Sequence, residues 1–229
     1  MIRNVLIDLD NTILDFDKAE QVALGKTMRE LGLEPTDERI AVYHRVNKLC
    51  WERLERKEIE RAEVFRLRFA LFFKEVGIAE DPDKGEAVYE KNLSVGHYFM
   101  PGAEELLKTL SAEYRLFLAS NGVAAIQKGR IASAGIAPYF EQMFVSEHLG
   151  YNKPDPAYFD AAFALIPGGV DRAETVIIGD SLTSDILGGN NAGIRTVWFN
   201  PTGAPRREGV SIDREVSALT EIPAVLKTL

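Results

Sequence analysis

The chain has 229 residues, 46% of them hydrophobic and 27% charged, a composition typical of a globular protein with one or two domains. Its formal net charge of -8 disfavours a general grip on nucleic-acid phosphates, and its only cysteine, Cys50, excludes an internal disulfide and a thiolate zinc site. No apolar run approaches the roughly 20 residues of a membrane helix, and Asp8 and Asp10 interrupt any signal peptide, so we expect a cytoplasmic protein without membrane or nucleic-acid partners.

The first predicted element is a short apolar strand that ends in two carboxylates, Asp8 and Asp10. Alternate side chains of a strand point to the same face, so both carboxylates would project together at the strand's C-terminal end, where α/β sheets place ligand sites. Taken alone, the same residues also suit a surface turn or a helix cap. An EF-hand calcium loop that starts at Asp8 is excluded, because Ile13 and Ala19 stand where glycine and glutamate are required.

The next 80 or so residues carry apolar side chains at helical spacing and no strand pattern. Gly25-Lys26-Thr27 does not end a phosphate-binding loop, because Glu20 stands where such a loop needs its first glycine. Four helices are predicted, over residues 16–33, 37–54, 62–76 and 83–93. We therefore predict an all-helical domain over residues 16–97.

From Pro101 onward, strand and helix patterns alternate. Strands are predicted over 115–119, 142–145, 175–178 and 196–199, and helices over 103–110, 124–134, 156–165, 184–192 and 222–226. This alternation, with Val, Ile and Leu in the strands, implies an α/β fold with a parallel sheet that is covered on both faces. The first strand belongs to the same sheet. The prediction is a Rossmann-like core of residues 1–15 and 98–229, interrupted by the helical domain, with a surface loop over 201–213.

Polar residues follow each predicted strand, and parallel strands bring such residues to one edge of the sheet. In chain order they are Asp8 and Asp10, then Ser120-Asn121-Gly122, then Lys153, then Asp180 with Asp185. Carboxylates crowded together repel one another, at a cost on the order of several kcal/mol where water is partly excluded, so a cation should sit among them. With oxygen ligands only, Mg²⁺ is the best candidate. Ser120, Asn121 and Lys153 could bind a phosphate dianion beside it.

These segments resemble, in order and spacing, the four sequence motifs of the haloacid dehalogenase superfamily, and the helical domain stands where that family inserts its type-1 cap. The resemblance implies that Asp8 is the nucleophile that forms an aspartyl-phosphate and that Asp10 is the general acid and base. It further implies phosphate binding by Ser120 and Lys153. Mg²⁺ would be held by Asp8, the Asp10 backbone carbonyl and Asp180, with Asp185 nearby and Thr12 as a support of the first loop.

Asp10 also discriminates between reactions of that family. A halide leaving group needs no proton, and the dehalogenase branch lacks the second aspartate, so Asp10 favours a phosphatase or a phosphotransferase. The partner we expect is a small phosphorylated metabolite, bound by a monomer or a homodimer. A receiver-like Mg²⁺-binding signalling domain, from a different functional class, is disfavoured because it would use only about half of the chain and has no place for the helical insertion.

The helical domain should decide the substrate. Residues 46–51 and 66–69 resemble the cap of pyrimidine-type 5'-nucleotidases, which implies a nucleoside monophosphate. Asn47 and Trp51 lie one helical turn apart and could hydrogen-bond and stack on a base, although a pair of this kind also fits packing inside the cap. Phosphoglycolate, a sugar phosphate or a phosphomutase reaction are the alternatives. A domain joined to the core by two crossings could close over the site and exclude water.

Overall fold

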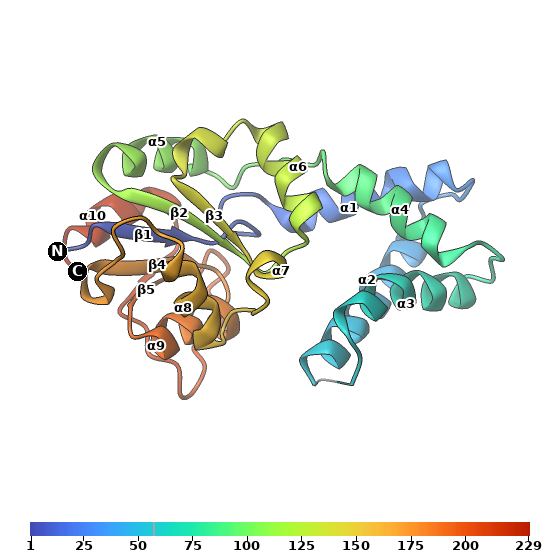
Figure 1. The fold of residues 1–229 in the computed structure, drawn as a ribbon. Coiled ribbons are helices and arrows are strands. Elements are labelled where there is room, and N and C mark those ends of the chain that lie inside the picture. Colours follow the sequence, from blue (N-terminus) through green and yellow to red (C-terminus); the bar gives the residue numbers. More distant parts are fainter. Residues whose placement is uncertain (57) are drawn as a thin grey trace. The chain divides into compact units, whose positions relative to one another are not determined.

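The computed structural model describes residues 1–56 and 58–229. The chain divides into two compact units, one of residues 1–16 with 97–229 and the other of residues 17–96. The first unit contains the sheet, and the second is helical (Figure 1). Among the described residues, no helix combines the length and the apolar character needed to cross a membrane.

Within the described residues, the first unit has a six-stranded sheet whose paired strands are all parallel, in the order β3-β2-β1-β4-β5-β6. The strands are β1 (Asn4–Ile7), β2 (Arg115–Ser120), β3 (Gln142–Val145), β4 (Thr175–Gly179), β5 (Arg195–Phe199) and β6 (Arg214–Val216). The predicted parallel sheet is confirmed. Strand β6 was not predicted, because Arg214 and Glu215, two of its three residues, are charged and exposed, so no apolar run marks it.

Helices cover both faces of the sheet (Figure 1). They are α5 (Ala103–Glu113), α6 (Ala124–Ala134), α7 (Ser146–Leu149), α8 (Pro156–Ala164), α9 (Leu187–Ala192) and α10 (Ile222–Leu226), with 3₁₀ turns at Ala137–Tyr139, Arg172–Glu174 and Leu219–Glu221. A π-helical turn, Leu182–Ile186, precedes α9. The predicted α-helix over 184–192 therefore begins later than expected, because its first residues form this wider turn.

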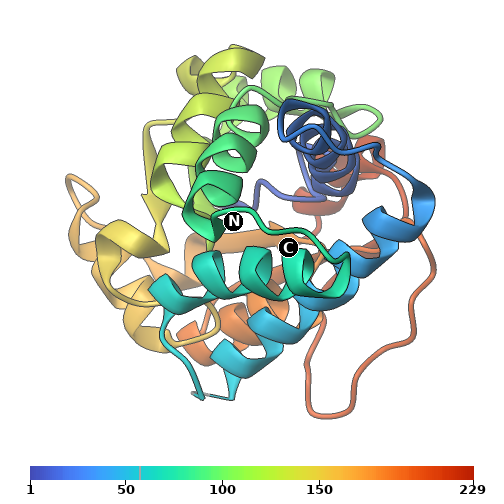
Figure 2. The same cartoon turned by 90° about the vertical axis from the view of Figure 1, so that its right-hand side faces the viewer.

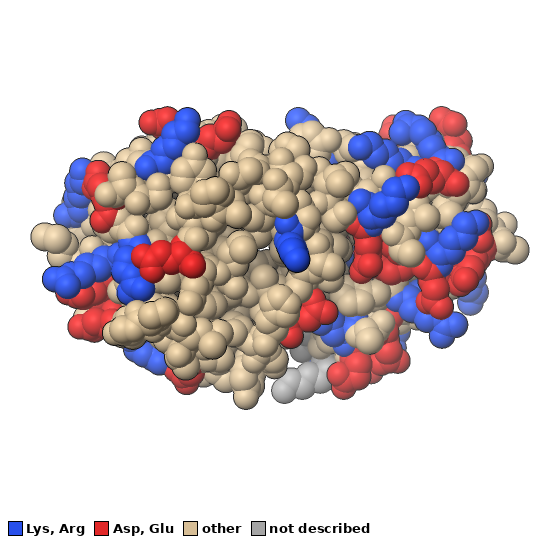
Figure 3. Space-filling model, turned by 45° about the horizontal axis from the view of Figure 1, so that its top comes forward, with Lys and Arg blue, Asp and Glu red and all other residues tan. Residues whose placement is uncertain are grey.

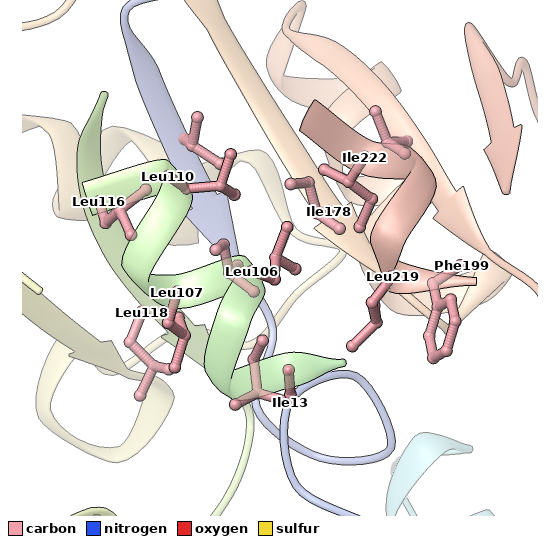
Figure 4. Packing of buried hydrophobic residues seen from close by; sticks show 14 of the residues in the cluster. Ile13, Leu106, Leu107, Leu110, Leu116, Leu118, Ile178, Phe199, Leu219 and Ile222 are labelled. Atoms are coloured by element: carbon pink, nitrogen blue, oxygen red, sulfur yellow. The ribbon is translucent and has the colours of Figure 1, made fainter. Parts of the chain in front are cut away.

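Alternate strand residues pack on opposite faces, as the pleat of a strand requires. On one face Ile7, Leu118 and Ile178 join side chains of α5 and α10 in a cluster that is partly shown in Figure 4. On the other face Leu6 and Ile177 join a cluster that includes α8 residues. Because both faces are covered, the open positions for ligands lie at the ends of the strands.

The described residues of the second unit form four helices, as predicted (Figures 1 and 2). They are α1 (Phe16–Glu30), which starts at the last residue of the first unit, α2 (Asp37–Glu55), α3 (Arg61–Glu75) and α4 (Pro82–Leu93). Helix α3 packs against both α2 and α4. Thr36 begins α2 by accepting a hydrogen bond from the Arg39 backbone N–H through its side chain. Cys50 is fully buried in an apolar cluster with Val46 and Val64.

The two segments that lead out of and into the first unit are paired with each other. The Asp15 N–H donates to the Tyr98 carbonyl at 2.7 Å, and the Met100 N–H donates to the Ile13 carbonyl at 2.9 Å. Leu14 forms a β-bridge with Phe99. The helical unit is thus connected to the first unit by two chain segments that lie side by side.

Charged side chains of both signs are interspersed on the face shown in Figure 3. Exposed ion pairs of the described residues include Arg115 with Glu141 at 2.8 Å and Lys91 with Glu30 at 2.9 Å. Water and salt screen exposed pairs of this kind, so they contribute little to stability, and the buried ion pairs described below matter more.

Candidate active site

The end of β1 places two aspartates at the centre of the sheet edge. Ile7 pairs with Leu118 on one side and Ile178 on the other, so Asp8 emerges between β2 and β4. Leu9 is fully buried. Asn11 adopts a left-handed backbone conformation with φ 58°, and its side chain accepts a hydrogen bond from the Phe16 N–H at 2.8 Å. This local turn lets the chain leave the strand abruptly, so that Asp8 and Asp10 stay at the edge.

Asp8, Asp180 and Asp185 form an acidic cluster in which one carboxylate oxygen from each lies within 4.8 Å of the others. The Lys153 ammonium donates to Asp8 Oδ1 at 2.7 Å, to Asp185 Oδ1 at 2.6 Å and to the Ala119 carbonyl at 2.6 Å. Lys153 and Asp185 are almost fully buried. The structure thus brings together residues that follow β1, β3 and β4, as the order of the strands implied.

The acidic cluster has three carboxyl groups for the single ammonium group of Lys153. Burial, and then the neighbouring carboxylates, hold the pKa of Asp8 well above its ordinary value, although Lys153 opposes the shift. Burial and Asp185 raise the pKa of Asp180 to about 7. Burial alone would lower the pKa of Lys153, but Asp185 and Asp8 outweigh it and raise that pKa. Buried carboxylates in excess of a single ammonium group are a donor set that suits a divalent cation with oxygen ligands, so the residues present fit Mg²⁺.

The loop after β2 holds the Lys153 segment in place. Asn121 Nδ2 donates to the Lys153 carbonyl at 2.9 Å, and the Lys153 N–H donates to Asn121 Oδ1 at 2.8 Å. The Lys153–Pro154 peptide bond is cis. Ser120 is fully buried, and its hydroxyl oxygen accepts from the Gly122 N–H at 3.0 Å. Phosphate binding by Asn121 stays a prediction, because the amide contacts seen here support the neighbouring loop instead.

Thr12 joins the first loop to the loop after β4. Its hydroxyl oxygen accepts a hydrogen bond from the Asp180 N–H at 3.1 Å, and the hydroxyl donates to Asp180 Oδ1 at 3.4 Å. Asp185 Oδ2 accepts from the Ser181 N–H at 3.1 Å. Gly179 makes this close approach possible, since a Cβ there would lie 2.2 Å from Asp185 Oδ2. The position of each acidic side chain is therefore set by backbone contacts as well as by charge.

Two residues that were not predicted to belong to the site contact Asp10. Gln127 Nε2 donates to Asp10 Oδ2 at 2.6 Å, and Arg130 forms an ion pair with Asp10 Oδ1. Both come from α6, and both are almost fully buried. The sequence held one indication of their role. In the predicted helix over 124–134, Gln127 and Arg130 are three residues apart and so lie on one side, next to the apolar residues Ile126 and Ile131.

Asn47 and Trp51 belong to the helical unit and contact each other. Trp51 Nε1 donates to Asn47 Oδ1 at 3.1 Å, and the Trp51 ring packs edge-on against Phe65. Asn47 Nδ2 donates to Glu20 Oε1 at 3.1 Å, and Arg68 Nη1 donates to Asn47 Oδ1 at 3.3 Å. Their polar atoms are therefore used within the unit, and their role toward a substrate stays a prediction.

Replacing Lys153 by methionine should destabilise the metal-free protein. The change removes the partner of buried Asp8 and Asp185, and breaking a buried ion pair in this way costs about 3 to 5 kcal/mol. Urea unfolding would measure the free energy of unfolding, and added Mg²⁺ should recover part of the loss. Lys128→Met, on the exposed side of α6, is the control and should stay within about 0.5 kcal/mol of wild type. Equal stability of the two variants would contradict this account of the cluster.

Comparison with known proteins agrees with this geometry. Residues 2–193 match the haloacid dehalogenase-like hydrolase family. Pyrimidine 5'-nucleotidase PynA of Streptococcus pneumoniae is 41% identical over 198 residues, which cover 86% of this chain and 83% of PynA. Pyrimidine 5'-nucleotidase YjjG of Escherichia coli is 28% identical over 97% of this chain and 96% of its own. The magnesium-bound crystal structure of YfnB from Bacillus subtilis, 36% identical, covers 98% of both chains with a TM-score of 0.92.

Proposed function

The chain belongs to the haloacid dehalogenase-like hydrolases, and we propose that it hydrolyses phosphomonoesters with Mg²⁺ by way of an aspartyl-phosphate. The observation that carries the proposal is the cluster of Asp8, Asp180 and Asp185 around Lys153, with Asp10 two residues beyond Asp8. A phosphomonoester is a dianion that hydrolyses very slowly in water, so its site must supply positive charge and a proton for the departing oxygen. The cluster provides for both needs.

The residues divide the reaction between them. An Asp8 carboxylate oxygen attacks phosphorus, the bond from phosphorus to the ester oxygen breaks, and Asp10 gives that oxygen a proton. Water then attacks the phosphorus of the aspartyl-phosphate, Asp10 takes the proton of that water, and inorganic phosphate leaves with the Asp8 carboxylate restored. Lys153 and Ser120 hold the phosphoryl oxygens. Asp8, the Asp10 carbonyl and Asp180 would hold Mg²⁺, which supplies positive charge against the phosphoryl oxygens when bound.

The test is phosphate release from a panel of monoesters, with Mg²⁺ and with chelator. The panel contains nucleoside monophosphates, sugar phosphates, phosphoglycolate and phosphoserine, together with a 2-haloacid whose halide release is followed in parallel. We expect Mg²⁺-dependent phosphate release from at least one monoester. Halide release without phosphate release would overturn the proposal.

Within this activity, a nucleoside monophosphate is the proposed substrate, and residues 17–96 are the proposed cap. The support comes from the names of PynA and YjjG, both pyrimidine 5'-nucleotidases, and from the placement of Asn47 and Trp51 on one side of α2. Phosphoglycolate or a sugar phosphate is the alternative that the panel would reveal. A higher kcat/KM for either of these than for every nucleotide would displace the nucleotidase proposal and leave the phosphatase proposal standing.

Replacing Trp51 by alanine should lower kcat/KM for a nucleoside monophosphate by roughly 10-fold or more, because stacking on a base contributes about 1 to 3 kcal/mol. A small aryl phosphate, which has no base, should be affected much less. Trp51→Phe is the matched control, since it keeps an aromatic ring and loses the hydrogen bond to Asn47. Equal losses on both substrates would mean that Trp51 packs the helical unit and does not meet the base.

A further inference from the structure

The Asp10 carboxylate is held at both oxygens by side chains of α6. Gln127 Nε2 donates to Asp10 Oδ2 at 2.6 Å, and Arg130 Nη1 donates to Asp10 Oδ1. Arg130 Nη1 also donates to Gln127 Oε1 at 3.0 Å. The three side chains therefore form a closed ring of hydrogen bonds, in which Gln127 both donates and accepts. This ring determines the orientation of the Gln127 amide, because only its nitrogen can donate to a carboxylate.

Gln127 extends the ring to the loop after β2. Its Nε2 lies 2.9 Å from Ser120 Oγ as well as 2.6 Å from Asp10 Oδ2, so the two amide hydrogens serve two acceptors. Ser120 is a proposed phosphate ligand, and Asp10 is the proposed proton donor. One buried amide thus ties the position of the proton donor to that of a group expected to bind the substrate phosphate.

The surroundings leave these side chains little freedom. Gln127 is 1% exposed and Arg130 is fully buried, whereas the Asp10 side chain is 27% exposed. The Arg130 guanidinium also lies over the Phe16 ring, 5.4 Å from its centroid. A Cβ on Gly122 would lie 2.2 Å from Gln127 Nε2 and 2.7 Å from its Cδ, so glycine at this position makes room for the amide. The buried side chains of Gln127 and Arg130 therefore hold the more exposed Asp10 carboxylate in one orientation.

We infer that Gln127 and Arg130 are positioning residues that orient the Asp10 carboxylate for proton transfer, and that Gln127 couples that orientation to Ser120. The inference rests on the proposed function, in which Asp10 protonates the leaving oxygen. A proton donor works only within hydrogen-bond reach of the atom it serves, and well-placed general acids contribute about 10²- to 10⁴-fold to rate. A displacement of about 1 Å can remove much of that factor.

The test uses two esters of similar size that differ in their need for a proton, phenyl phosphate and 4-nitrophenyl phosphate. Nitrophenolate leaves readily without a proton, whereas phenolate benefits from one. Gln127→Met removes the donor and keeps the length of the side chain. We expect kcat/KM to fall roughly 10-fold or more for phenyl phosphate and less than about 3-fold for 4-nitrophenyl phosphate. Loss of structural integrity alone would lower both values by the same factor.

Four further variants separate a positioning role from a general effect on the fold. Gly122→Ala should displace Gln127 without removing any donor, and should reproduce the unequal loss. Arg130→Lys keeps the charge and should retain more activity on phenyl phosphate than Arg130→Met, whose fold is checked by circular dichroism. Lys128→Met, which removes a positive charge from the exposed side of the same helix, should leave both esters unaffected.

The outcomes separate this inference from the proposed function. Unequal loss in Gln127→Met and Gly122→Ala, with Lys128→Met unchanged, supports the positioning role. If both variants lose the same factor on the two esters, or lose nothing, the positioning role is overturned while phosphatase activity stands. A wild-type protein that releases phosphate from neither ester and from no monoester of the panel would overturn the proposed function and this inference together.

Discussion

Asp8→Asn should abolish turnover and leave the fold intact. An amide is not a nucleophile, and no other residue of the cluster replaces Asp8 in the proposed reaction, so the rate should fall by roughly four orders of magnitude or more. The fold should survive because Lys153 keeps its contacts with Asp185 at 2.6 Å and with the Ala119 carbonyl at 2.6 Å. Burial and the neighbouring carboxylates hold the pKa of Asp8 well above its ordinary value, so a negative charge is costly at this position. The neutral amide removes that cost.

Steady-state phosphate release and thermal melting would measure the two effects. The melting temperature of the metal-free Asp8→Asn protein should equal or exceed that of wild type. Asp160→Asn makes the same chemical change at an exposed position and should keep full activity. Near-wild-type phosphate release by Asp8→Asn would show that another group attacks phosphorus.

Removal of Mg²⁺ should abolish activity, and its return should restore it. Without a divalent cation, the Lys153 ammonium contacts two of the three clustered carboxylates, those of Asp8 and Asp185, and a phosphate dianion would add further negative charge to the same place. Asp180→Asn should need a much higher Mg²⁺ concentration for half-maximal activity, since a proposed ligand is lost. A rate that is unchanged by chelator would refute the metal requirement.

The same metal should stabilise the fold in a pH-dependent manner. Burial and Asp185 raise the pKa of Asp180 from 3.8 to about 7 in the metal-free protein. The contribution of Asp180 to stability is therefore fully present below pH 3.8 and is lost as the pH rises through about 7. Mg²⁺ binds ionised carboxylates, so a fixed concentration should raise the melting temperature more at pH 8 than at pH 6. An equal rise at both values would argue against Asp180 as a ligand.

Local sequence patterns predicted the parallel sheet, apart from β6, and the chain order of the residues that follow its strands. Apolar runs such as Val5-Leu6-Ile7 are a local signal, and parallel strands must deliver the residues that follow them to one edge. For this reason Asp8, Lys153 and Asp180 could be grouped before any distance was known. The helical insertion was equally readable, since its four helices carry their own periodicity and end signals.

The hydrogen bonds between side chains of different segments depend on how those segments pack in three dimensions. Gln127 and Arg130 look like ordinary members of a helix until the packing of α6 brings them onto Asp10. In the same way, Trp51 donates its indole N–H to Asn47, one turn away, a contact that the spacing permits but does not require. Hydrogen-bond partners depend on rotamers and on the docking of whole elements, which sequence periodicity does not encode. Strand β6 was not predicted for a related reason. It has no apolar run of its own, and it is a strand because it pairs with β5.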